Sequence, residues 1–134
     1  MGSEFEKKRR ESYSRISSDV SDKLFMKIID VIGPGKAYLD PNYTAAKMAK
    51  ELGTNPRYVS VAIATHTGGN FNQLINGYRL REAYRMLRSS KHRKDRVEKI
   101  GLACGFSSRQ AFYLAFHREQ KMTPRQYRMK TDEV

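Results

Sequence analysis

One pattern occurs twice in this sequence: a short apolar helix, a turn that contains glycine, and a second helix with apolar residues four positions apart. Glycine suits such turns because it adopts the left-handed backbone conformation that other residues avoid. Two helices joined by a tight turn with glycine form a helix-turn-helix motif. The pattern predicts one unit at about residues 44–67 and another at about residues 95–120. The repeated positions are Gly53, Val59 and Ile63 in the first copy and Gly105, Phe112 and Phe116 in the second.

Between the two copies, residues 70–89 predict one long linker helix. Each half has apolar residues at i, i+3, i+4 and i+7, and the two stripes point in roughly opposite directions. The stripes are Phe71, Leu74, Ile75 and Tyr78, and then Leu80, Ala83, Tyr84 and Leu87. Each half should therefore pack into a different small core. A break near Gly77 is the alternative, because glycine weakens a helix interior.

No stretch alternates apolar and polar residues over the length of a strand, so the expected class is all-α with about seven helices. A first helix is expected from Ser18 to just before Gly33, and a last short helix after Thr123 that carries Tyr127. Residues 1–17 are interpreted as a vector-derived start, MGSEF, followed by a flexible polar lead-in. Residues 18–134 then form the domain. Ser107 or Ser108 should cap the second helix of the second unit, with Ser107 and Gln110 matching a capping box.

The charge is concentrated in the same region as the repeat. Of the net charge of +12, residues 1–40 contribute +1 and residues 41–134 contribute +11, from 18 basic and 7 acidic side chains. Such a region indicates a polyanionic partner, although a basic solvated surface is the alternative.

Several other function classes find no support in the sequence. The one cysteine, Cys104, lies in an apolar stretch and is interpreted as a core residue. No catalytic constellation, metal-ligand spacing or phosphate-binding glycine loop is present, so we expect no enzyme activity, no metal and no cofactor. No apolar run is long enough to span a membrane, which favours a cytoplasmic protein without membrane contact.

Three segments resemble the DNA-binding domain of the AraC/XylS transcription regulators, over about residues 39–129. They are MAKELGTNPRYVS, FNQLINGYRLREAYRML and KIGLACGFSSRQAFYLAFHREQKMTPRQYR. The resemblance implies two helix-turn-helix subdomains on one linker helix. Each subdomain would insert its second helix into the major groove of double-stranded DNA, in two successive segments about 34 Å apart.

The family's base-reading positions fall on Arg57, Ser60 and Val61 in the first unit, and on Arg109, Gln110, Tyr113 and Leu114 in the second. Arginine can pair with guanine and glutamine with adenine, while Val61 or Leu114 can touch a thymine methyl group. Candidate phosphate contacts are Thr44, Asn55, Ser108, Arg93, Lys94 and Arg96. Tyr113 is equally consistent with surface packing.

The sequence departs from the family at three positions. Val61 and Leu114 stand where many members have a long polar or basic residue, which weakens the case for a base hydrogen bond there. Gly101 replaces the usual alanine and should loosen its helix by up to about 1 kcal/mol, unless close packing requires it.

The expected function is sequence-specific DNA binding as the output domain of a bacterial transcription regulator, with an activator role and RNA polymerase as a further partner. A sensor or dimerisation domain is expected elsewhere in a larger parent protein, which would respond to a nutrient or to phosphorylation. The alternative function is a non-specific nucleic-acid or protein interaction module.

Overall fold

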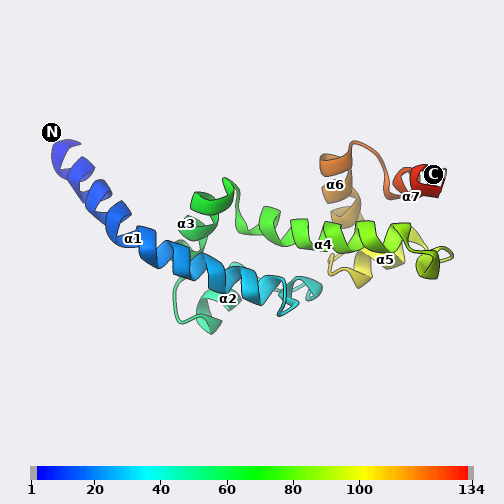
Figure 1. The fold of residues 1–134 in the computed structure, drawn as a ribbon, viewed down its shortest axis with the longest axis horizontal. Helices are drawn as coiled ribbons and strands as arrows, with labels where there is room; N and C mark the ends of the chain where they lie inside the picture. Colours follow the sequence, from blue (N-terminus) through cyan, green and yellow to red (C-terminus); the bar gives the residue numbers. More distant parts are fainter. Residues whose placement is uncertain (1–2, 133–134) are drawn as a thin grey trace.

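The computed structural model describes the backbone of residues 3–132 and the side chains of residues 18–131. This part of the chain contains seven α-helices, two short 3-10 helices and no strand, which confirms the predicted all-α class (Figure 1). The elements are α1 (Ser3–Ile32), η1 (Ala37–Leu39), α2 (Ala45–Glu51), α3 (Pro56–Thr67), α4 (Phe71–Arg88), η2 (Ser90–His92), α5 (Val97–Ala103), α6 (Arg109–Gln120) and α7 (Pro124–Asp132).

Helix α4 joins two separate hydrophobic cores. It is continuous through Gly77, as predicted, and not broken there. Ile75 in its first half belongs to a core built with α1, α2 and α3, and Leu80 in its second half belongs to a core built with α5, α6 and α7. The two apolar stripes therefore serve two bodies, because they point in different directions around one helix.

The apolar residues repeated in the two units occupy equivalent places in the two cores. Val59, Ile63, Phe112 and Phe116 are all fully buried, so α3 and α6 turn the same face inward. Gly53 and Gly105 both have positive φ values, 68° and 103°, as a left-handed turn requires. The helix-turn-helix pattern of the sequence is thus present in both bodies.

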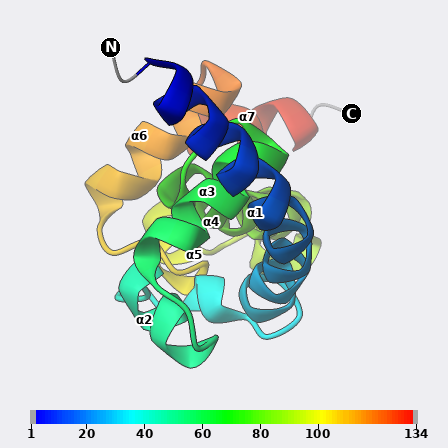
Figure 2. The ribbon, with the colours of Figure 1, turned by 90° about the vertical axis from the view of Figure 1, so that its left-hand side faces the viewer.

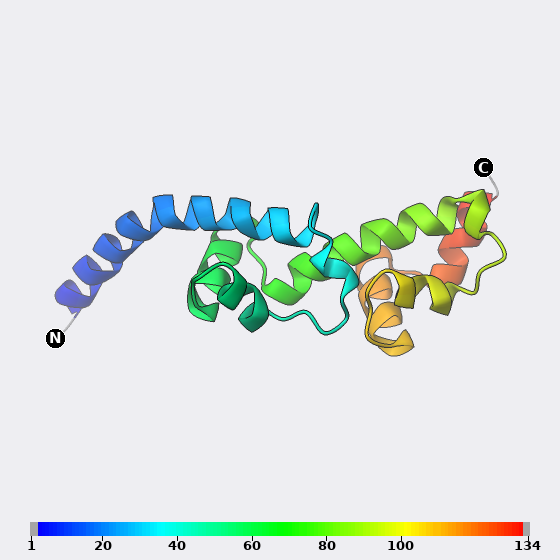
Figure 3. The same cartoon turned by 90° about the horizontal axis from the view of Figure 1, so that it is seen from below.

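Helix α1 begins at Ser3 and not near Ser18, so the expected start was wrong. The segment from Ser3 to Ile32 contains neither glycine nor proline and is rich in Glu, Lys and Arg, so nothing in it stops a helix. Met1 and Gly2, the first residues of the expected vector-derived start, lie outside the described residues. In Figures 1 and 3 the first turns of α1 extend away from the rest of the molecule.

One local prediction at the second unit, the capping box, also needs correction. Ser108, and not Ser107, caps α6, and no capping box between Ser107 and Gln110 is formed. A capping box does form at the start of α4, between Asn70 and Gln73. Leu102, an apolar residue of α5, is 52% exposed, because α5 turns Val97, Ile100 and Gly101 inward.

The arrangement of the helices leaves both helix-turn-helix pairs on one side of the molecule. In Figure 3 the α2–α3 pair and the α5–α6 pair lie on the same side of the line formed by α1 and α4. Figure 2, which looks along the long axis, shows α4 near the middle, between α1 and α6.

Candidate nucleic-acid interface

Side-chain caps fix the starts of the helices at this surface. The Asn55 Oδ1 atom accepts a hydrogen bond from the Tyr58 backbone N–H at 2.9 Å, and the Ser108 Oγ atom accepts one from the Ala111 N–H at 3.0 Å. Thr44 caps α2 in the same way. These caps use only the side-chain oxygen as acceptor, so the hydroxyl and amide hydrogens are left as donors. With the positive end of the helix dipole, each start of α3 and α6 suits a phosphate.

The candidate base-reading residues occupy the outer face of α3 and α6. Arg57, Ser60, Arg109 and Gln110 are exposed, and Leu114 is 68% exposed. Their exposure follows from the packing of the opposite face in the cores.

Two candidates are less accessible than predicted. Val61 and Tyr113 are half-buried, so each presents only part of its side chain to a partner. Val61 is therefore limited to an apolar edge contact. Tyr113 also uses its hydroxyl group inside the protein.

Tyr113, Glu98 and Arg109 form a polar cluster between α5 and α6. The Tyr113 hydroxyl donates to Glu98 Oε1 at 2.9 Å, and Arg109 Nε lies 3.8 Å from the same oxygen. The Arg109 guanidinium also lies 5.3 Å from the centre of the Tyr113 ring. Burial, and then the bond to Glu98, raises the pKa of Tyr113.

An open, mainly basic groove lies beside this cluster, between α5 and α7. Lys94 and Arg96, two of the candidate phosphate contacts, line the groove, and both are exposed. The charged residues of the groove are Lys94, Asp95, Arg96, Glu98, Lys99, Arg109, Arg125 and Arg128. Six of these eight are basic, so the groove attracts anions.

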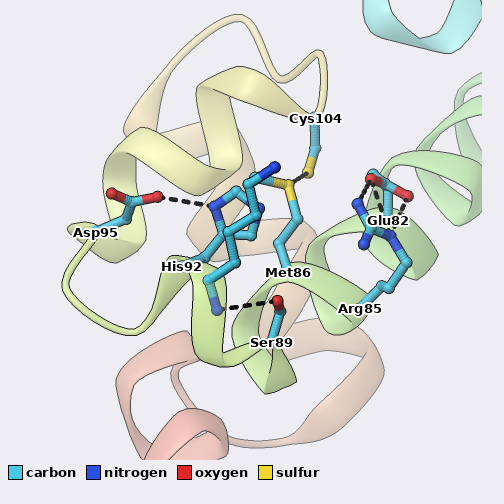
Figure 4. A network of polar contacts seen from close by, with 8 residues as sticks. Glu82, Arg85, Met86, Ser89, His92, Asp95 and Cys104 are labelled. Atoms are coloured by element: carbon cyan, nitrogen blue, oxygen red, sulfur yellow. Dashed lines mark hydrogen bonds and ion pairs between the residues drawn. The ribbon is translucent and has the colours of Figure 1, made fainter.

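The loop that carries Arg93 and Lys94 is closed by a bond between the two residues that flank it. His92 Nδ1 lies 2.9 Å from Asp95 Oδ2, and Figure 4 shows this bond close to the end of α4. The bond to His92 lowers the pKa of Asp95, which stays charged at neutral pH. The loop therefore presents Arg93, which is exposed, from a defined position.

A buried arginine joins the two bodies. Arg79 on α4 is 7% exposed and donates to the carbonyl groups of Tyr38 at 2.7 Å and Asp40 at 2.9 Å. At the same place Gly105 has so little space that an added Cβ would overlap the Tyr38 carbonyl oxygen. The turn of the second unit thus packs directly on the loop of the first body, which sets the relative position of α3 and α6.

Cys104 is a core residue, as predicted. It is fully buried, its thiol lies 3.6 Å from the Met86 sulfur (Figure 4), and burial raises its pKa to about 12. A thiol with this pKa is inert at neutral pH. Among the described residues, no group of three or more His, Cys, Asp or Glu side chains could hold a metal ion. No helix in the described part of the chain is long and apolar enough to span a lipid bilayer.

Sequence reasoning missed two residues at this surface, Glu98 and Arg125. Glu98 contacts Tyr113 fifteen positions later, and Arg125 comes from α7 to line the same groove. No local pattern indicates these partners. Glu98 could have been found only by placing the faces of α5 and α6 against each other.

The combination of two capped helices on one face, a linker helix and a basic groove defines a class of double helix-turn-helix nucleic-acid-binding domains. A family model described as "Helix-turn-helix domain" matches residues 48–130. The chain belongs to this family, the AraC-type helix-turn-helix domains, and it is a sequence-specific DNA-binding domain of a transcription regulator. A search of curated protein sequences finds no match.

Solved structures share the fold at low sequence identity. The C-terminal domain of the two-component response regulator yesN from Fusobacterium nucleatum is 22% identical, with a TM-score of 0.65 over 80% of this chain and 96% of that one. The C-terminal domain of AraT, a response regulator from Geobacillus stearothermophilus, is 22% identical, with a TM-score of 0.67 over 83% and 84%. An AraC-type transcriptional regulator from Chromobacterium violaceum is 20% identical, with a TM-score of 0.64 over 85% and 94%.

Proposed function

We propose that α3 and α6 each enter the major groove of one DNA duplex, in two successive segments on the same face. The observation that carries this proposal is the placement of two capped, twelve-residue helices on one side of the molecule, joined through one rigid helix. The 18 residues of α4 span about 27 Å at 1.5 Å per residue. This length is close to one helical turn of DNA, about 34 Å.

Within this arrangement, the exposed residues on each helix have separate roles. Arg109 pairs with guanine and Gln110 with adenine in the segment read by α6, and Arg57 and Ser60 contact the segment read by α3. Leu114, which is highly exposed, packs on a thymine methyl group. Val61 and Tyr113 contribute edge contacts from their half-buried positions.

The caps and the basic loop hold the phosphate backbone. Donors at Thr44, Asn55 and Ser108 and cations at Arg93, Lys94 and Arg96 supply affinity without sequence choice. The domain acts by binding alone, in the cytoplasm, as the output part of a longer regulator with a sensor or dimerisation domain. The fold shared with C-terminal domains of response regulators is compatible with this place in a longer protein. In this role the domain activates transcription by contact with RNA polymerase.

A non-specific clamp is the second candidate, and the apolar side chains on the reading faces favour it. Val61 and Leu114 offer no hydrogen bond to a base edge. If both helices read little sequence, binding depends mainly on phosphates and falls steeply as salt rises.

Selection of bound duplexes from a random DNA pool tests the proposal. We expect a motif with two blocks of preferred bases about one helical turn apart. Arg57→Ala should weaken the base preference in one block and Arg109→Ala in the other, each by about 1–3 kcal/mol of discrimination between bases. Lys27→Ala is the control, because it removes an exposed cation from α1, outside both reading helices, and should leave both blocks intact. If the selected duplexes share no motif, the proposal of sequence-specific recognition is wrong and the non-specific clamp is favoured.

A further inference from the structure

The carboxylate of Glu98 lies in the middle of a surface that should attract phosphates. Resting on the proposed function, we infer that Glu98 is a positioning residue that orients the Arg109 guanidinium for recognition of a base in the groove read by α6. Glu98 does not itself touch DNA in this arrangement. It determines which base Arg109 prefers by limiting the orientations of an otherwise mobile side chain.

The geometry of the cluster supports this role. Glu98 Oε1 faces the Nε side of Arg109 at 3.8 Å, and the guanidinium also lies near the Tyr113 ring. Guanidinium is planar and has its donors in a fixed fork, so a partner on the Nε side leaves the terminal NH2 groups to span two acceptors. Guanine presents two such acceptors, O6 and N7, in the major groove.

Glu98 itself is well fixed. Its side chain is 27% exposed, and its oxygen accepts the hydroxyl hydrogen of Tyr113 from α6. Its own backbone N–H and the Tyr113 bond lower the pKa of Glu98, so it is charged at neutral pH. Arg109, by contrast, has a side chain that is 69% exposed and has many rotamers to lose on binding. The fixed Glu98 carboxylate limits the rotamers of Arg109 before DNA binds, so Arg109 loses less conformational entropy on binding.

Electrostatics argues against a role in affinity. A negative charge in a groove lined by six cations repels the phosphates that those cations attract. Glu98 therefore lowers the affinity of the domain for any DNA. A role of Glu98 in the choice of base explains why a carboxylate is present where it weakens the binding of DNA.

The internal repeat shows that the cluster is not required by the fold. Fully buried Met48 and Ile100 match each other in α2 and α5, and Val59 and Phe112 match in α3 and α6. In this register the first unit has none of the three side chains. Glu98, Arg109 and Tyr113 correspond to Ala46, Pro56 and Ser60. Both units nevertheless form the same helix pair, so the fold does not need the cluster. We therefore assign the cluster to the recognition of bases by the second unit.

Glu98→Gln tests the inference, because glutamine keeps the length of the side chain and an acceptor for Tyr113 but loses the charge that holds Arg109. We expect the 134-residue chain with this substitution to melt at the same temperature as the unsubstituted chain. In the random-pool selection, preference in the Arg109 block should fall about three- to tenfold, while the other block is unaffected. Affinity for an unrelated duplex should rise.

Glu119→Gln is the control, since it removes one exposed carboxylate from α6, ten residues away from Arg109 along that helix. It should raise affinity for unrelated DNA and leave the motif intact. In the Arg109→Ala background, Glu98→Gln should no longer change the preference for any base. If Glu98→Gln destabilises the domain, Tyr113→Phe gives a second test, with a smaller loss of preference expected in the same block.

The outcomes separate the two proposals. If the wild-type chain selects two blocks and Glu98→Gln behaves like Glu119→Gln, the positioning role is wrong and the proposed function stands. If the wild-type chain selects no motif, the proposed function fails, and the positioning role fails with it.

Discussion

A single missing methyl group determines how α5 packs on α6. Gly101 is buried in α5, and a Cβ atom at this position would overlap the ring of Phe112. Phe112 is itself fully buried, so it has no free volume into which to move. The departure from alanine at this position is thus a packing requirement and not a weak point of the helix.

We therefore expect Gly101→Ala to destabilise the domain by about 1–3 kcal/mol, the usual cost of overpacking a core. Gly77→Ala is the matched control, because a Cβ atom there meets nothing within 4 Å and φ is not positive. It should stabilise the domain by about 0.5–1 kcal/mol through helix propensity. Chemical denaturation of both variants measures the difference, and equal free energies of unfolding would show that Phe112 can yield.

For single residues, the sequence predicts burial where it follows from the local spacing of apolar residues. Val59 and Phe112 were placed in the cores because they lie four positions from another apolar residue on a helix. The inward face of α5 was not predicted, because α5 is only seven residues long, too short for its apolar stripe to be defined without its partner helix. Glu98 was missed because its partners come from another helix.

The packing of α1 on α3 depends on a histidine. The His66 ring stacks on Phe25 with centroids 4.4 Å apart, and its two nitrogens lie 2.8 Å from the Ala62 carbonyl and 2.7 Å from Asp22 Oδ1. Asp22 and Phe25 are on α1, whereas His66 is in the last turn of α3. A proton on His66 therefore strengthens the contact between the two helices.

Stability should accordingly depend on pH. The bond to the Ala62 carbonyl, and then Asp22, raises the pKa of His66 above its ordinary value of 6.5. A group whose pKa is higher in the folded state stabilises it fully below the ordinary value, and this contribution is lost as pH rises through the raised pKa. We expect the melting temperature to fall between about pH 6 and pH 8.

Thermal melts at constant ionic strength would show this dependence. Asp22→Asn should flatten it, since the carboxylate that favours the protonated ring is gone. Asp19→Asn removes an exposed charge from the same helix and should leave the slope unchanged. An equal slope in all three proteins would rule out the His66–Asp22 pair as its source.

Elements with strong boundary signals were predicted well, and elements without them were not. The start of α4 after Gly69 and the start of α7 at Pro124 follow from turn residues in the sequence. The start of α1 carries no such signal, since helix-forming residues continue without interruption to Ser3. The 3-10 helices η1 and η2 were not predicted, because three residues are too few for any period to show.

At the scale of the whole molecule, the relative position of the two reading helices depends on the junction at Arg79. Its guanidinium contacts two carbonyl groups of the loop around η1 and the Asn76 side chain, and it lies 5.9 Å from the Phe106 ring in the second core. Burial lowers the pKa of Arg79, yet an arginine stays charged at neutral pH. The buried cation thus connects the first body, α4 and the second body.

A rigid junction makes the two reading helices act as linked binding modules. Once α6 is bound, α3 meets its own groove segment at a high effective concentration, which depends on the fixed spacing between them. Loosening the junction should therefore weaken binding to a two-block site much more than binding to a duplex with one block.

Arg79→Met tests this dependence, because methionine fills a similar space but leaves the Tyr38 carbonyl without a donor and leaves the Asp40 carbonyl with the Tyr43 N–H alone. We expect a loss of stability of about 1–3 kcal/mol for the Tyr38 carbonyl that is left unpaired. For the protein that remains folded, affinity for the two-block duplex should fall by about tenfold or more, and affinity for a one-block duplex should change little.

Wild-type binding should also drop when one base pair is inserted between the blocks, and the variant should tolerate the insertion better. Circular dichroism establishes that the variant is folded at the temperature of the assay. Equal losses on the one-block and two-block duplexes would mean that Arg79 stabilises the fold without setting the spacing of the two reading helices.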